Sequence, residues 1–316
     1  MPPRLFVRPR SLCACALFIM LALNAGCTQL AKLKGSGAST ETTAVGQKLD
    51  LYVQCLNDVD GALHHTYAEY TARVDRAKGP AKDHAPTSLY IRNEIEPCFD
   101  KLKQGAAAPP PRAELDAAAQ GYLAALQQLA PVLKEATEYY RQEDYKDDNF
   151  AKGKQLHAPL LAAFESFDKA SEQFHTALDA EDERFKEREL SEIEQQQGRN
   201  LSYFSRAVML RAKQLVKLGQ AEPFDLAKYQ SALDAYTQSV DEAANYFTAH
   251  RAELGDRVSC WQTVERAARD FLKEGKEKVR NLRENKKPQP GLFSSDRFID
   301  AYNSLIMMSN NCRRML

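Results

Sequence analysis

Apolar residues recur at intervals of three and four along most of the chain, the spacing that places side chains on one face of an α-helix. The first such run begins at Gln47 and predicts a helix to about Val74. Its shared face consists of Leu49, Tyr52, Leu56, Val59, Leu63 and Tyr70. No stretch shows the strict alternation that is typical of a half-buried strand. The pattern therefore predicts an all-α protein.

Further helices follow, separated by clusters of Gly, Pro and polar residues. They are expected to begin near Thr87 or Ser88, Arg112, Pro159, Pro223, Asp256 and Asp296. The longest is expected to run from Pro159 to Leu218, and its segment 181–197 is charged almost all round. A helix that is polar on all sides projects beyond its neighbours or depends on charge pairs. Together these runs predict an elongated antiparallel bundle of about seven helices.

The N-terminus has the pattern of a secretory leader. Three arginines precede an apolar run at 11–25, which ends in Ala25-Gly26-Cys27. The run is about 15 residues long, short of the ~20 needed to span a bilayer. We therefore expect a lipoprotein signal peptide over residues 1–26, with Cys27 carrying the lipid. The alternative is an ordinary signal peptide cut next to a free Cys27.

Residues 27–46 are small, polar and rich in Gly, Ser and Thr, which predicts a flexible tether. Thr28 directly follows the lipid site, and in a Gram-negative cell a residue other than Asp there favours the outer membrane. The expected location is the cell envelope, with the chain facing the periplasm. Residues 47–316 form the expected all-helical periplasmic region, long enough for one elongated domain or two small ones.

Net charge argues against nucleic acid as a partner. The 316 residues include 43 basic and 43 acidic side chains, and removal of the leader leaves a slight acidic excess. Such a balance produces no strong positive field.

Four cysteines follow the tether, namely Cys55, Cys98, Cys260 and Cys312. An even number in an oxidising compartment indicates two disulfides, for which three connectivities exist. Antiparallel hairpins bring the early part of one helix to the late part of the next, which favours Cys55–Cys98 and Cys260–Cys312. Four buried free thiols are the alternative.

The richest group of polar side chains lies in a predicted connector at 140–157. It contains Tyr140, Asp144, Tyr145, Asp147, Asp148, Lys152, Lys154 and His157. Carboxylates with carbonyls can hold Ca²⁺, but the spacing of an EF-hand loop is absent. One hypothesis is a binding loop for a ligand or partner. The other is that an acidic residue or Asn149 caps the next helix and the lysines are solvated.

Other candidates are weaker. His65 and Glu69 share a helix face, but the HExxH pattern is absent, so we expect the His64-His65 pair at the surface. Glu172 and His175 form one Glu-x-x-His, whereas a di-iron bundle requires two. The segment 273–287 holds seven basic and three acidic residues, which suits lipid head groups, anionic glycans or a solvated helix face. No cofactor, metal or catalytic site is predicted.

Three segments resemble a known family. They are KLDLYVQCLNDVDGALHHTYAEY at 48–70, YYRQEDYKDDNFAKGKQLHAPLLAAFESF at 139–167 and FIDAYNSLIMMSNNC at 298–312. Behind the lipoprotein leader, the chain is similar to the YiiG-type bacterial envelope lipoproteins, a group without an established function. The resemblance implies an all-helical periplasmic lipoprotein and supplies no catalytic residues.

The expected function is a non-enzymatic envelope lipoprotein, held at the membrane by its lipid, that acts as a binding or scaffold module. Its partner is an envelope protein or the cell wall, and the expected contact surfaces are the segments 181–197 and 142–157. The alternative is a periplasmic receptor that binds a small ligand or metal ion at the connector. An enzyme would need carboxylates that converge from distant helices, which a sequence does not reveal.

Overall fold

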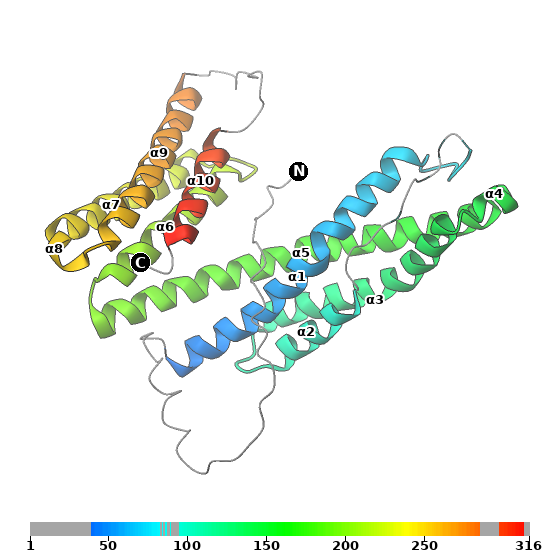
Figure 1. Ribbon diagram of the computed structural model, residues 1–316, viewed down its shortest axis with the longest axis horizontal. Helices are drawn as coiled ribbons and strands as arrows, with labels where there is room; N and C mark the ends of the chain where they lie inside the picture. The colour runs from blue at the N-terminus through cyan, green and yellow to red at the C-terminus, as the bar shows by residue number, and fades with distance from the viewer. Residues whose placement is uncertain are drawn as a thin grey trace, which may run out of the picture. The chain divides into compact units, whose positions relative to one another are not determined.

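The computed structural model describes residues 39–82, 84, 86, 89, 95–284 and 297–312. The expected signal peptide, Cys27 and the first part of the expected tether lie outside these ranges. The described chain is built from helices and their connecting turns, which confirms the all-α prediction (Figure 1). It divides into two compact units, one from Thr40 to Phe185 and one from Lys186 onward.

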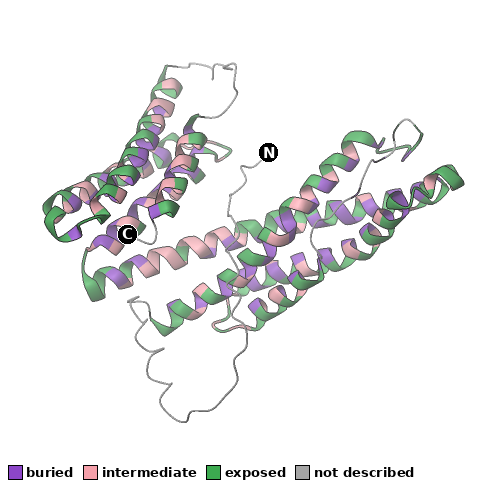
Figure 2. Ribbon diagram, viewed as in Figure 1, coloured by how far each residue is buried: buried purple, intermediate pink, exposed green. Residues whose placement is uncertain are grey.

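Unit 1 is a bundle with an aromatic core. Its elements are α1 (Thr40–Arg73), α2 (Glu96–Ala107), α3 (Ala113–Arg141), the one-turn α4 (Tyr145–Asp148) and the first part of α5 (Ala151–Gln197). The Tyr122 ring of α3 lies 5.7 Å from that of Phe167 and 5.1 Å from that of Phe174, both on α5. Tyr52 of α1 meets Phe174 edge-on at 5.4 Å. Buried and exposed positions alternate along each helix in the ribbon, as expected for helices with one buried side (Figure 2).

Helix α1 begins at Thr40, earlier than the expected start at Gln47. Thr42 and Val45 are both buried, and they extend the apolar face of α1 toward its N-terminus at the same spacing. The last part of the expected tether is thus the first two turns of α1. The small, polar composition of this stretch concealed the helical spacing.

The single helix expected over 159–218 is wrong. Helix α5 ends at Gln197, and Gly198 has a left-handed backbone with φ of 73°. Helix α6 (Leu201–Gly219) then begins, and the Asn200 side chain accepts the Tyr203 amide at 3.0 Å. Glycine in this conformation ends helices, and Asn is a favoured N-cap. These local signals outweigh the continuous apolar spacing across the break.

The charged segment 181–197 depends on charge pairs and does not stand free of its neighbours. Glu181, which is 3% exposed, pairs with Arg112 at 2.9 Å within unit 1. Within unit 2, Glu187 pairs with Arg211 of α6. Leu190 and Ile193 in the same segment are buried in the core of unit 2. This segment is therefore mostly a packing surface.

Unit 2 is a second helical bundle. With the end of α5 and α6, it contains α7 (Leu226–Ala249), the one-turn α8 (Arg251–Leu254), α9 (Arg257–Arg283) and α10 (Arg297–Cys312). Trp261 of α9 stacks on Phe247 of α7 with ring centroids 4.1 Å apart. Asp225 caps α7, which begins after the expected start at Pro223, whereas Asp256 makes no side-chain cap on α9.

Both expected disulfides are present. Cys55 of α1 is bonded to Cys98 of α2, and Cys260 of α9 is bonded to Cys312 of α10. The sequence separations are 43 and 52 residues. Each bond joins two helices of one unit, as the hairpin argument predicts. None of the described helices is apolar and long enough to cross a bilayer.

Candidate functional site

The predicted connector is a compact turn–helix–turn at one end of unit 1, where α4 lies (Figure 1). Helix α5 begins at Ala151, so Lys152, Lys154 and His157 belong to its first turns and not to a loop. Three residues have left-handed backbones, namely Glu143, Asn149 and Phe150. Residues other than glycine rarely adopt this backbone conformation, so the surrounding packing must hold these turns in place.

Asp148 links α3 to the start of α5. Its Oδ1 accepts a hydrogen bond from the Tyr139 hydroxyl at 2.7 Å, and its Oδ2 accepts the Lys152 amide at 2.8 Å. A carboxylate at the first turn of a helix satisfies an amide that has no partner within the helix. The capping hypothesis is thus correct for Asp148.

His157 and Tyr140 lie inside the bundle. His157 is 7% exposed, with Nδ1 at 2.8 Å from the Tyr70 hydroxyl and Nε2 at 3.1 Å from the Arg76 carbonyl oxygen. Tyr140 is 6% exposed and its ring lies 4.9 Å from that of Tyr139. The His157 contacts hold the end of α1 against α5.

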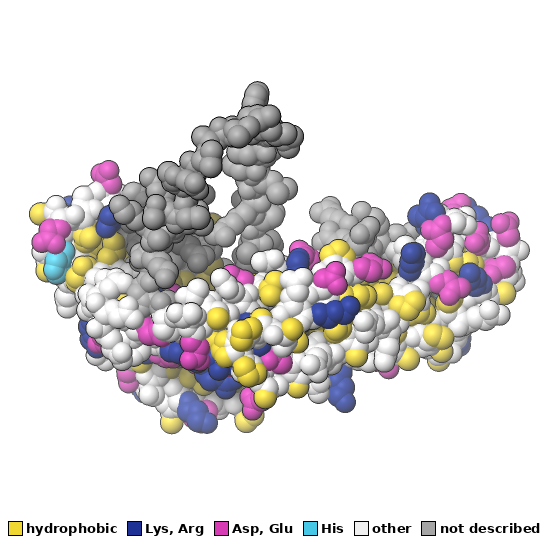
Figure 3. Space-filling model, turned by 90° about the horizontal axis from the view of Figure 1, so that it is seen from below, with side chains coloured by type: hydrophobic (Ala, Val, Ile, Leu, Met, Phe, Trp, Pro, Cys, Tyr) yellow, Lys and Arg dark blue, Asp and Glu magenta, His cyan; other side chains and the backbone are white. Residues whose placement is uncertain are grey.

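Asp144, Asp147, Lys152 and Lys154 are the exposed members of the predicted group. Neither Asp144 nor Asp147 has an ion-pair partner in the part of the chain that the structure describes, whereas the adjacent Glu143 pairs with Lys146 at 2.5 Å. Acidic and basic side chains lie side by side on the surface at this end of unit 1 (Figure 3). The structure thus brings all eight predicted residues together but turns some inward and others outward.

A second polar cluster, around Asp60 on α1, was not predicted. Asp60 is 7% exposed. Its Oδ1 accepts hydrogen bonds from the Ser171 hydroxyl of α5 at 2.6 Å and the Tyr122 hydroxyl of α3 at 3.0 Å. Its Oδ2 faces Nε2 of His175 at 3.0 Å and Nε2 of His64 at 3.6 Å. We call Asp60, His64, Tyr122, Ser171 and His175 the Asp60 cluster.

The electrostatics of the Asp60 cluster favour a charged pair. Burial raises the pKa of Asp60, but hydrogen bonds from His175 and Ser171 outweigh it, and the net pKa is below the usual value. The hydrogen bond to Asp60 raises the pKa of His175 although burial opposes it. Burial and the nearby Asp60 raise the pKa of the Tyr122 hydroxyl well above its usual value. Asp60 is therefore held as a carboxylate.

Part of this cluster has the connectivity of a catalytic triad. The Ser171 hydroxyl lies 3.2 Å from Nε2 of His64, and Nδ1 of His64 lies 3.3 Å from Oδ1 of Asp168. However, Ser171 is 1% exposed, and its hydroxyl donates a hydrogen bond to Asp60. Amides in the middle of α5 are engaged in helical hydrogen bonds, so they offer no oxyanion hole. The cluster therefore joins α1, α3 and α5 rather than presenting a nucleophile.

The metal-binding hypotheses gain no support from the geometry. Among the described residues, no group of three or more His, Cys, Asp or Glu side chains is arranged to hold a metal ion. Glu172 is exposed and lies outside the Asp60 cluster, although His175 one turn later belongs to it. An aspartate, Asp60, on the apolar face of α1 next to Val59 is a sequence signal for one buried carboxylate, but it does not reveal the partners of Asp60 on α3 and α5.

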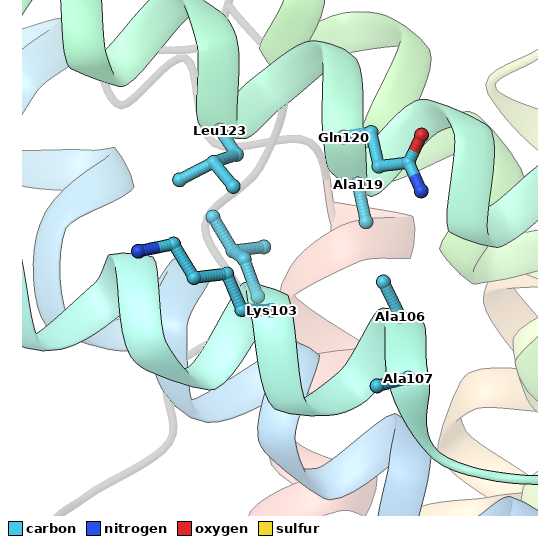
Figure 4. A pocket seen from close by; sticks show the side chains of 7 residues that line it. Lys103, Ala106, Ala107, Ala119, Gln120 and Leu123 are labelled. Carbon is cyan, nitrogen blue, oxygen red and sulfur yellow. The ribbon is translucent and has the colours of Figure 1, made fainter.

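A shallow groove of about 330 Å³ lies between α2 and α3. Figure 4 shows the α2 side chains of Lys103, Ala106 and Ala107 opposite side chains of α3. Leu102, Ala119, Gln120 and Leu123 complete the lining. The groove has one charged side chain and one amide, so it offers little for the recognition of a polar ligand.

Comparisons with known proteins place the chain in an uncharacterised group. The family model described as "Protein of unknown function (DUF3829)" matches residues 43–311. The "Uncharacterized protein YiiG" of Escherichia coli (strain K12) is 32% identical over 189 residues, which cover 58% of this chain and 54% of that relative. The match thus spans about half the length of the relative. No solved structure matches the chain.

Proposed function

The chain belongs to the DUF3829 family of proteins of unknown function, and we propose that it is a lipid-anchored envelope protein that binds a partner in the periplasm. The leader pattern that directly precedes Cys27 supports the anchor. The proposed partner is an envelope protein or the cell wall, and the proposed membrane is the outer one. The proposed role is binding or scaffolding without catalysis.

The observation that carries this proposal is the outer surface of the 140–157 segment. Asp144 and Asp147 are exposed and, among the described residues, unpaired, while Asp148 and the buried aromatic rings fix the backbone that carries them. Carboxylates held in place before contact lose little conformational entropy on binding. They fit a partner surface that presents basic groups, because complementary charge speeds and orients association.

The same geometry favours a partner surface over a small-ligand receptor. The side chains that would hold a ligand at this place are His157 and Asp148, and both have their polar atoms engaged within unit 1. A ligand would have to displace these hydrogen bonds. Contact through Asp144 and Asp147 displaces only water.

In-cell crosslinking tests the proposed surface. A photo-crosslinking residue at the exposed Glu143 is expected to capture a specific envelope partner. Combined Asp144→Lys and Asp147→Lys substitutions should abolish this capture and leave the melting temperature unchanged. Asp148→Ala is the matched control, because loss of the cap lowers stability by about 1 kcal/mol and leaves the two outer carboxylates in place.

Two results would contradict the proposal. Capture that survives the double charge reversal would show that the acidic surface does not carry the interaction. A melting temperature lowered as much by the double reversal as by Asp148→Ala would assign Asp144 and Asp147 to folding instead.

The anchor is tested separately. Metabolic labelling with a fatty acid should mark the protein, and Cys27→Ser should remove the label and release the chain into the soluble periplasmic fraction. An unlabelled wild-type protein in that fraction would show that an ordinary signal peptide precedes it.

A further inference from the structure

The outer face of α9 carries a stripe of basic side chains. Its members are Arg266, Arg269, Lys273, Lys276, Arg280 and Arg283, and all six are exposed. They are spaced alternately by three and four residues, which places them along one side of the helix. The opposite side, with Trp261, Phe271 and Val279, is buried in the core of unit 2. We call these six residues the α9 basic stripe.

The stripe is only partly neutralised. Arg269 pairs with Glu265 at 2.9 Å and Asp241 at 3.2 Å, and Arg280 pairs with Glu277 at 2.8 Å. The other four members have no carboxylate within ion-pair distance among the described residues, namely Arg266, Lys273, Lys276 and Arg283. On α9 itself, Glu265 and Glu277 are the acidic side chains that neutralise members of the stripe. An excess of positive charge therefore faces solvent.

The shape of the stripe fits an extended anionic surface. At 1.5 Å per residue, the distance from Arg266 to Arg283 is about 25 Å along a helix. Charges spread over this length cannot converge on one small anion, but they match a plane of phosphates.

We propose that the α9 basic stripe docks onto the anionic phospholipid head groups of the membrane that holds the protein. This inference rests on the proposed lipid anchor, which would keep the chain close to that surface. A few basic residues attract an anionic membrane weakly, so they act as the second signal beside a lipid chain. Docking through α9 would orient unit 2 on the membrane.

Vesicle binding by the unlipidated chain tests docking apart from the anchor. The mature protein with Cys27→Ser and intact disulfides is sedimented with phosphatidylcholine vesicles that either contain or lack phosphatidylglycerol. Binding is expected with phosphatidylglycerol only, and added salt should weaken it. Combined Lys273→Glu, Lys276→Glu and Arg283→Glu substitutions should lower this affinity at least about tenfold.

A matched control separates the stripe from net charge. Three exposed lysines of unit 1 receive the same change in Lys82→Glu, Lys134→Glu and Lys169→Glu. This variant should retain most of the binding, and circular dichroism should show both variants to be folded. Equal loss in both variants, equal binding to the two kinds of vesicle, or binding to soluble dextran sulfate but not to vesicles would overturn membrane docking. None of these results bears on labelling at Cys27 or on crosslinking at the acidic surface.

Discussion

At the scale of single residues, unit 1 buries charges that are neutralised by partners from other helices. Lys48 of α1 is fully buried, and its Nζ lies 2.7 Å from Oδ2 of Asp116. Oδ1 of the same carboxylate accepts a hydrogen bond from the Tyr52 hydroxyl at 2.8 Å. Asp60 is the second such centre. Removal of one partner from a buried pair is costly because it leaves the other charge uncompensated. These two aspartates therefore hold the helices in register.

Substitution of Asp60 should be far more harmful than that of Asp58, two residues away. Asp60→Ala leaves the buried Tyr122 and Ser171 hydroxyls and His175 without their acceptor, which should cost about 2–4 kcal/mol. Asp58 forms a partly exposed pair with Lys101, so Asp58→Ala should cost at most about 1 kcal/mol. Urea unfolding followed by circular dichroism measures both. Similar losses would show that the Asp60 cluster adds nothing beyond a surface pair.

The Asp60–His175 pair also predicts how stability depends on pH. The raised pKa of His175 adds stability that is fully present below pH 6.5 and is lost as the pH rises through the folded value. The lowered pKa of Asp60 adds stability above pH 3.8 that is lost as the pH falls through the folded value. The pair is thus strongest between these limits.

His175→Gln removes the titrating group and should flatten the loss of stability between about pH 5.5 and pH 8.5. Because the His175 side chain is 47% exposed, we expect solvent screening to limit the effect to on the order of 1 kcal/mol or less. The unfolding free energies of the wild type and the variant are measured at both pH values, and the loss between the two values is compared. If the unfolding free energy of the variant changed with pH as steeply as that of the wild type, His175 would not be the source of the pH dependence.

At the scale of elements, apolar spacing was sufficient for the long helices and insufficient at their ends. The face of α1 follows from the sequence because side chains three and four residues apart share a helix face. The break at Gly198 was missed because the same spacing resumes beyond it. The location of the 140–157 segment was predictable since its residues are contiguous. The Asp60 cluster was not, because Asp60 and His175 meet only after α1 packs on α5.

Two glycines test how closely the helices of unit 1 approach. A Cβ at Gly105 of α2 would overlap the Tyr52 ring of α1, whereas one at Gly121 of α3 meets no atom within 4 Å. Gly105→Ala should therefore destabilise the protein by about 1–3 kcal/mol through overpacking. Gly121→Ala should stabilise it by up to about 1 kcal/mol, because alanine favours the helix more than glycine does. Thermal unfolding separates the two, and stabilisation by Gly105→Ala would refute the close contact.

At the scale of the whole molecule, two hydrophobic cores share one helix. The last buried apolar residue of α5 in the first core is Leu178, and the first in the second core is Leu190. The residues between them are largely charged and half-buried. Each core has its own disulfide, Cys55–Cys98 in unit 1 and Cys260–Cys312 in unit 2. This arrangement predicts that each unit has its own stability.

Removal of one disulfide should therefore weaken one unit only. The two disulfides close loops of 43 and 52 residues. In the chain-entropy model each disulfide then stabilises the folded state by about 4 kcal/mol. Combined Cys55→Ala and Cys98→Ala should accelerate amide hydrogen exchange in α1, α2 and α3, and leave α7, α9 and α10 protected as in the wild type. Cys260→Ala with Cys312→Ala should give the reverse pattern. Equal acceleration in both units by either variant would show that α5 couples them into one cooperative fold, because loss of order in one core would then unfold the other.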